Sequence, residues 1–182
     1  TKHNYRVDIM STISGDIMEN DVKKWLEKIE QVKKGDVDLS RDEDLSIAIM
    51  NLISLEEHFF FTAMKTENQK YLEMLNSVRD IRKKLLAKIV TNPKGEEWCI
   101  SKHLLAASMR LIEVGTKELS KKNQEEANNF FASAFELYSL FFAINLKMIE
   151  TEKLQHTEEF KKEEKRMSKF SAIIKKIVDC CK

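Results

Sequence analysis

Apolar side chains recur every three or four positions along most of this chain, which is the period of a helix with one buried face. The pattern predicts helices over about residues 16–35, 40–65, 69–90, 96–121, 124–153 and 157–181. Gly35 is expected to end the first helix, and Ser40 to cap the start of the second. Residues 1–15 have mixed character and are interpreted as an N-terminal arm or a short helix, so that residues 16–182 form a single all-helical domain.

No segment shows the strict alternation of polar and apolar residues that is typical of strands. Only four glycines and one proline occur in 182 residues, which is too few for the many turns of a β-architecture. A chain of this length buries roughly 70% of the surface that it exposes when unfolded, enough for a core without disulfide bonds. The expected fold is therefore all-α: a compact bundle of five to seven antiparallel helices.

The second predicted helix is apolar around most of its circumference, which favours a place at the centre of the bundle. Polar residues form a line along this helix and another along the fourth helix. The eight residues of the two lines are Asn51, Ser54, His58 and Thr62, and Cys99, His103, Arg110 and Glu113. A buried polar group without a partner costs about 1–3 kcal/mol, so we expect the two lines to meet in an internal polar seam. They are the candidate binding residues if that meeting leaves a cavity.

Histidine and cysteine are the natural candidates for a metal site or a nucleophile. The residues three positions before His58, His103 and His156 are not glutamate, which rules out the Glu-x-x-His ligands of ferritin-like di-iron proteins. No histidine has a second histidine four positions later, so the zincin pattern is absent as well. Cys99 and His103 share a helix face, but two residues do not complete a zinc site, and no third residue is identified to orient a nucleophile pair. We therefore expect no metal, no cofactor and no catalytic residue.

The charges nearly cancel, because 31 basic and 30 acidic residues leave a formal net charge of +1. This balance creates no global field that would draw the chain to nucleic acid. The three cysteines form no disulfide framework, which fits a reducing cytoplasm. The longest apolar stretch, SIAIMNLISLEEHFFFTAM, is broken by Asn51 and by residues 56–58, so we expect a soluble protein without a membrane partner.

The segment MRLIEVGTKELSKKNQEEANNFFASAFELYS, residues 109–139, resembles one tetratricopeptide repeat, a pair of helices of about 34 residues. Gly115 and Ala127 have the spacing of the small residues at which the two helices of that repeat touch, and Phe131 fills the space beside them. The resemblance implies a tight helical hairpin within a right-handed stack of hairpins. No second copy of the repeat is found about 34 residues before or after this segment. The alternative is therefore an ordinary bundle that contains one tight hairpin.

Clustered aromatic residues indicate contacts with more than one neighbour. Three consecutive phenylalanines, Phe59 to Phe61, span about 200° of a helix, so at least one of them must meet a second helix, a partner chain or a ligand. The last predicted helix is amphipathic with a basic face, and we expect it to pack on its own bundle.

These observations favour a non-catalytic interaction or scaffold module. Its partner is expected to be a protein, a peptide or a second copy of the chain, bound at an apolar groove beside the fourth and fifth helices. The alternative is a metal- or small-ligand-binding bundle, with or without enzyme activity, centred on His58, Cys99, His103 and Arg110.

Overall fold

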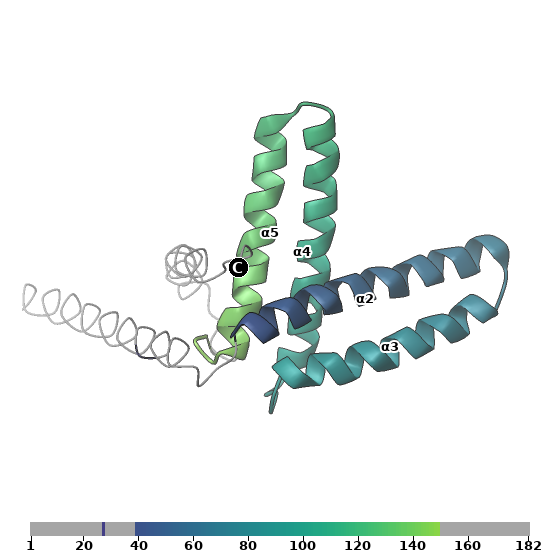
Figure 1. The fold of residues 1–182 in the computed structure, drawn as a ribbon, viewed down its shortest axis with the longest axis horizontal. Coiled ribbons are helices and arrows are strands. Elements are labelled where there is room, and N and C mark those ends of the chain that lie inside the picture. The colour runs from purple at the N-terminus through teal and green to yellow at the C-terminus, as the bar shows by residue number, and fades with distance from the viewer. Residues whose placement is uncertain (1–26, 28–38, 150–182) are drawn as a thin grey trace, which may run out of the picture. The chain divides into compact units, whose positions relative to one another are not determined.

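The computed structural model describes residue 27 and residues 39–149, and this part of the chain forms four helices and no strand (Figure 1). The helices are α2 (Leu39–Thr66), α3 (Lys70–Ile89), α4 (Glu97–Ser120) and α5 (Gln124–Asn145). The all-α class is therefore confirmed for the described residues. The predicted arm at 1–15 and the predicted helices at 16–35 and 157–181 lie outside them, so the expected number of helices and the domain boundary stay predictions. The four helices, apart from Leu39, belong to one compact unit.

The first three of these helices, α2 to α4, begin and end within one residue of the predicted positions. Ser40 nevertheless lies inside α2, which begins at Leu39, so the capping role predicted for Ser40 is wrong. α5 ends at Asn145, well before the predicted end near residue 153. Lys147 adopts a left-handed backbone conformation with φ of 56°, and the N–H groups of Lys147 and Met148 donate to the carbonyls of Ile144 and Ala143 at 2.9 and 2.8 Å. These backbone bonds satisfy the last carbonyls of the helix and turn the chain away from its axis.

α4 and α5 form a helical hairpin that packs through small residues (Figure 1). Gly115 is buried on α4, and a Cβ atom at this position would lie 2.6 Å from Cε1 of Phe131 on α5. Ala127 is fully buried, and the hydroxyl of Ser108 donates a hydrogen bond of 2.6 Å to the carbonyl of Ala134. The predicted packing of Phe131 against Gly115 is therefore confirmed, whereas the resemblance to a tetratricopeptide repeat stays a prediction.

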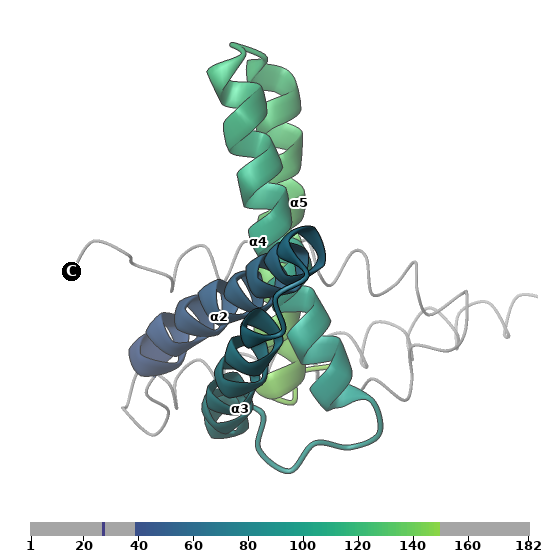
Figure 2. The same cartoon turned by 90° about the vertical axis from the view of Figure 1, so that its right-hand side faces the viewer.

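α2 and α3 run side by side and are joined by a buried ion pair (Figures 1 and 2). The carboxylate of Glu56 accepts hydrogen bonds from Nε of Arg82 at 2.8 Å and from Nε of Arg79 at 3.0 Å. Only 8% of Glu56 and 5% of Arg82 are exposed, so each charge depends on the other for the polar contacts that water no longer provides. Phe59 lies against Tyr71 in the same pair of helices, with ring centroids 6.4 Å apart.

Burial along α2 is uneven, and large apolar side chains are exposed near its C-terminal end. The hydroxyl of Ser46 shares a hydrogen bond of 2.7 Å with the hydroxyl of Tyr138 on α5, and Ile49 and Met50 are buried in the next turn of α2, whereas Ile47 keeps 45% of its surface exposed. Near the end of the helix, Phe60, Phe61 and Met64 keep 45, 60 and 54% of their surface exposed. No other described helix covers these side chains, and the place of α2 at the centre of a bundle stays a prediction.

By length and composition alone, α2 is also apolar enough to cross a membrane, and no other described helix is. Its most apolar window of 18 residues has a mean hydropathy of 1.2 and is 22% buried. The core helix of a soluble protein passes the same test, so this is weak evidence for a membrane span. The expectation of a cytoplasmic location stays a prediction.

Candidate functional site

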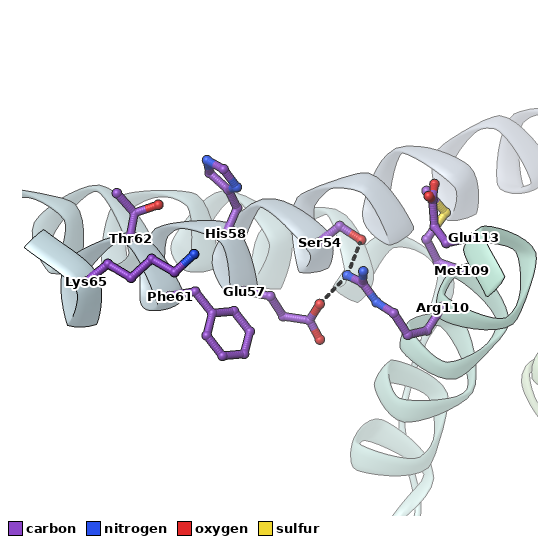
Figure 3. Close-up of a pocket in the computed structure, with 9 residues that line it drawn as sticks. All are labelled: Ser54, Glu57, His58, Phe61, Thr62, Lys65, Met109, Arg110 and Glu113. Atoms are coloured by element: carbon purple, nitrogen blue, oxygen red, sulfur yellow. Dashed lines mark hydrogen bonds and ion pairs between the residues drawn. The ribbon is translucent and has the colours of Figure 1, made fainter. Parts of the chain in front are cut away.

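An open hollow of about 560 Å³ lies where α4 meets the second half of α2, and we call it the α2–α4 hollow (Figure 3). Its lining residues are Ser54, Glu57, His58, Phe61, Thr62 and Lys65 of α2, and Met109, Arg110 and Glu113 of α4. The α2 residues follow one another at alternating steps of three and one, and the α4 residues lie within about one helical turn, so regular helix geometry is sufficient to bring each set to one side.

One ion pair joins the two walls of the hollow. The guanidinium of Arg110 pairs with the carboxylate of Glu57, and its Nη2 lies 3.4 Å from Oγ of Ser54 (Figure 3). The side chains of Arg110 and Glu57 are 53 and 45% exposed, so the pair contributes at most about 1 kcal/mol to stability. It marks one point at which α4 contacts α2.

Five of the eight residues predicted from the sequence line the hollow, namely Ser54, His58, Thr62, Arg110 and Glu113. The meeting of the two polar lines therefore occurs, but it does not form a buried seam. Ser54 and Thr62 are half-buried, and the other three are exposed. The seam prediction is wrong because the hollow opens to solvent, so water can satisfy these polar groups.

The other three predicted residues lie elsewhere. Asn51 is exposed, and its amide donates a hydrogen bond of 3.0 Å to the carbonyl of Ile47 on its own helix. Cys99 and His103 are exposed near the start of α4 and do not line the hollow. Cys99 precedes Arg110 by three helical turns, about 16 Å along α4, which separates it from the region where α4 contacts α2.

Four lining residues were missing from the candidate set: Glu57, Phe61, Lys65 and Met109. The first three stand four residues apart along α2, a spacing that places them on one face of a helix. The spacing is visible in the sequence. A phenylalanine with a charged residue four positions before it and another four positions after it is, however, also typical of an ordinary solvated helix end.

Two buried carboxylates outside the hollow hold the helices in place. Burial raises the pKa of Glu56, but the hydrogen bonds and positive charges of Arg82 and Arg79 outweigh burial and leave this pKa below its usual value. Glu97 is 4% exposed and accepts hydrogen bonds from Nζ of Lys147 at 2.5 Å and from the backbone N–H of Lys94 at 2.9 Å. Burial raises the pKa of Glu97 as well, and these two bonds more than compensate, so its net shift is also downward.

No family model, curated protein or solved structure matches the chain.

Within residues 39–149, no three histidine, cysteine, aspartate or glutamate side chains are grouped so that they could hold a metal ion. Cys99 has an exposed free thiol, and neither it nor His103 makes a hydrogen bond with another described residue. The hollow instead combines an exposed aromatic ring with charges of both signs at its rim. This combination is suited to contact with another amphipathic surface.

Proposed function

We propose that this chain is a non-catalytic helical interaction module that binds an α-helix of a protein partner at the end of α2. The binding surface is the α2 end face, which we define as Glu57, Phe60, Phe61, Met64 and Lys65. These residues fall within about 140° of the helix circumference. The observation that carries the proposal is the exposure of three large apolar side chains, 45, 60 and 54% for Phe60, Phe61 and Met64, which lie within five residues of one another at the end of α2.

The energetic reason is the burial of apolar surface. Covering a large side chain such as phenylalanine completely is worth about 1.5–3 kcal/mol, so half-exposed side chains that lie together leave a useful part of that free energy for a partner. Phe61 also lines the α2–α4 hollow, so the surface has a concave side. A helix that lays its apolar face into such a groove is a common mode of peptide recognition.

The proposal moves the binding surface from the predicted groove beside α4 and α5 to the end of α2. It retains the expected class of partner, a protein or a peptide. The exposed free thiol of Cys99 is compatible with the reducing cytoplasm in which we place the module.

The test uses peptides as probes, so it does not depend on knowing the partner. A displayed library of helical peptides with apolar residues at positions i, i+3, i+4 and i+7 is selected on the full chain. Binding of the enriched peptides is then measured on Phe61→Glu and on the control Leu119→Glu, which changes another exposed apolar side chain, 43% exposed against 60% for Phe61, on α4.

We expect the selected peptides to lose at least about tenfold in affinity for Phe61→Glu and to keep their affinity for Leu119→Glu. Both replaced side chains are exposed, so both variants should keep the circular dichroism of the wild type. Failure to enrich any helical peptide, or equal binding to the two variants, would refute the proposed function.

A further inference from the structure

We infer that the helix bound at the α2 end face is α2 of a second copy of this chain, in an antiparallel pair centred on Phe61. This inference rests on the proposed function and names its partner. It depends on the distribution of charge and apolar surface along α2 and on the positions of α3 and α4.

The charges on α2 are self-complementary. Glu57, Phe61 and Lys65 stand four residues apart, so they follow one another at about 6 Å along one face. When two copies of α2 run antiparallel with their Phe61 rings at the two-fold axis, Glu57 of each copy lies opposite Lys65 of the other. The apolar centre is thereby flanked by two identical pairs of opposite charge, as a two-fold symmetric interface requires.

Both charged groups have the capacity to make these pairs. No described residue forms an ion pair or a hydrogen bond with the ammonium group of Lys65. The carboxylate of Glu57 pairs with Arg110 but has two oxygen atoms, and an ionised carboxylate accepts about four hydrogen bonds. In the pair of helices, Glu57 would lie between Arg110 of its own chain and Lys65 of the second copy.

The α3 side of α2 leaves the α2 end face free. Glu56, which lies about 140° from Phe61 around the helix axis, holds α2 against α3 through Arg82, and Phe59 contacts Tyr71 on α3. Figure 3 shows Glu57 and Phe61 projecting from the same side of α2. Within residues 39–149 no helix covers Phe61, so an approaching helix meets side chains of α2 there.

The α4 side sets how far the second copy extends. α4 contacts α2 at Ser54 and Glu57 through Arg110. In the antiparallel register, Thr66, the last residue of α2 in the second copy, lies opposite residue 56. In the proposed pair, α2 of the second copy thus ends close to the point where α4 contacts α2 of the first copy. The last turn of that helix would lie in the α2–α4 hollow.

The expected dimer is weak. Stable interfaces bury about 1,200–2,000 Å² in total, and one pair of helix ends supplies only part of that area. We therefore expect a reversible equilibrium between monomer and dimer that depends on protein concentration and on salt.

The experiment is sedimentation velocity on the full chain, from about 1 µM to about 300 µM, at low and at high salt. The wild type should convert from monomer to dimer within this range, and Phe61→Glu should remain a monomer. Lys65→Glu places like charges opposite each other twice and should weaken the dimer at least about tenfold. Lys84→Glu on α3 is the matched control, because it reverses an exposed charge away from the α2 end face and should leave the dimer unchanged.

The deciding variant reverses the two charges together with Arg110, the partner of Glu57 within the chain. Glu57→Lys combined with Lys65→Glu and Arg110→Glu keeps opposite charges between α2 and α4 and restores them across the two-fold axis, so it should recover a substantial part of the dimer that Lys65→Glu loses. A wild type that is monomeric throughout, a dimer insensitive to Phe61→Glu, or a triple variant no better than Lys65→Glu would overturn the inference. If the chain is monomeric and the selected peptides still bind at Phe61, the proposed function stands and only its partner is wrong. If neither association occurs, both proposals fail.

Discussion

Replacing Gly115 with alanine would insert a methyl group into the contact between α4 and α5. The new Cβ atom would lie 2.6 Å from Cε1, 2.8 Å from Cδ1 and 3.2 Å from Cζ of the Phe131 ring. Non-bonded carbon atoms pack at about 3.5–4.0 Å, so the ring or the helix must move by roughly 1 Å. The substitution therefore tests how tightly the hairpin is packed.

Two effects of opposite sign determine the result. Alanine in a helix interior is more favourable than glycine by about 0.8–1.0 kcal/mol, which would stabilise the variant. Overpacking a contact of this kind costs about 1–3 kcal/mol. Because Phe131 is half-buried and turns about only two side-chain torsions, we expect the packing effect to prevail, with a net loss of about 1 kcal/mol.

Urea unfolding of the full chain, followed by circular dichroism, measures this difference. Thr116→Ala is the control, because the neighbouring side chain is exposed and its replacement should stabilise α4 by a few tenths of a kcal/mol. In a Phe131→Leu background, where the ring is gone, Gly115→Ala should become stabilising. The reasoning is refuted if Gly115→Ala stabilises the chain that still contains Phe131.

Further expectations concern the contacts of α2. Glu56→Gln should lower the free energy of unfolding by about 3 kcal/mol, because it leaves the buried Arg82 without a counter-charge. The pKa of Glu56 is lower in the folded chain than its usual 4.5, so its contribution to the free energy of unfolding is present above pH 4.5 and is lost as the pH falls through the folded pKa. In urea unfolding between pH 7 and pH 3, the free energy of unfolding should therefore fall less steeply with decreasing pH for Glu56→Gln than for the wild type. Tyr138→Phe removes the hydrogen bond to Ser46 and should destabilise by about 1 kcal/mol in the same assay. Phe61→Ser should change the unfolding free energy of the monomer by less than about 0.5 kcal/mol, and a larger loss would mean that the side chain is part of the core.

The sequence predicts the local features of this fold well. The bounds of α2, α3 and α4 follow from periodicity and from the short links between helices. The contact of Gly115 with Phe131 is also nearly local, because only a short link separates the helices that carry them and a hairpin of this kind has few alternative arrangements. The end of α5 was missed because the left-handed turn at Lys147 is made by backbone bonds that need no glycine.

The candidate site depends on the crossing of two helices that are distant in the chain, and periodicity does not determine such a crossing. Two polar lines were identified correctly as neighbours where Ser54 lies near Arg110. A crossing helix contacts only one or two turns of its neighbour, however. Cys99 and His103 at the start of α4 lie outside that contact and do not line the hollow. The exposure of Phe61 could not be predicted either, because its apolar side chain belongs to the longest apolar stretch of the sequence.

The buried ion pair and the exposed docking face of α2 are linked by helix geometry. Each residue of an α-helix advances by about 100°, so Phe61, five residues after Glu56, projects about 140° away from it around the axis. Once Glu56 is held toward α3 by Arg82, Phe61 must project away from α3. The hydrogen bond between Ser46 and Tyr138 fixes the other half of the helix, so α2 cannot rotate to bury the ring without breaking a buried polar contact at one end or the other. Its apolar end can therefore be covered only by something added to the four described helices, and its charges, glutamate on one side of Phe61 and lysine on the other, match an antiparallel copy of itself.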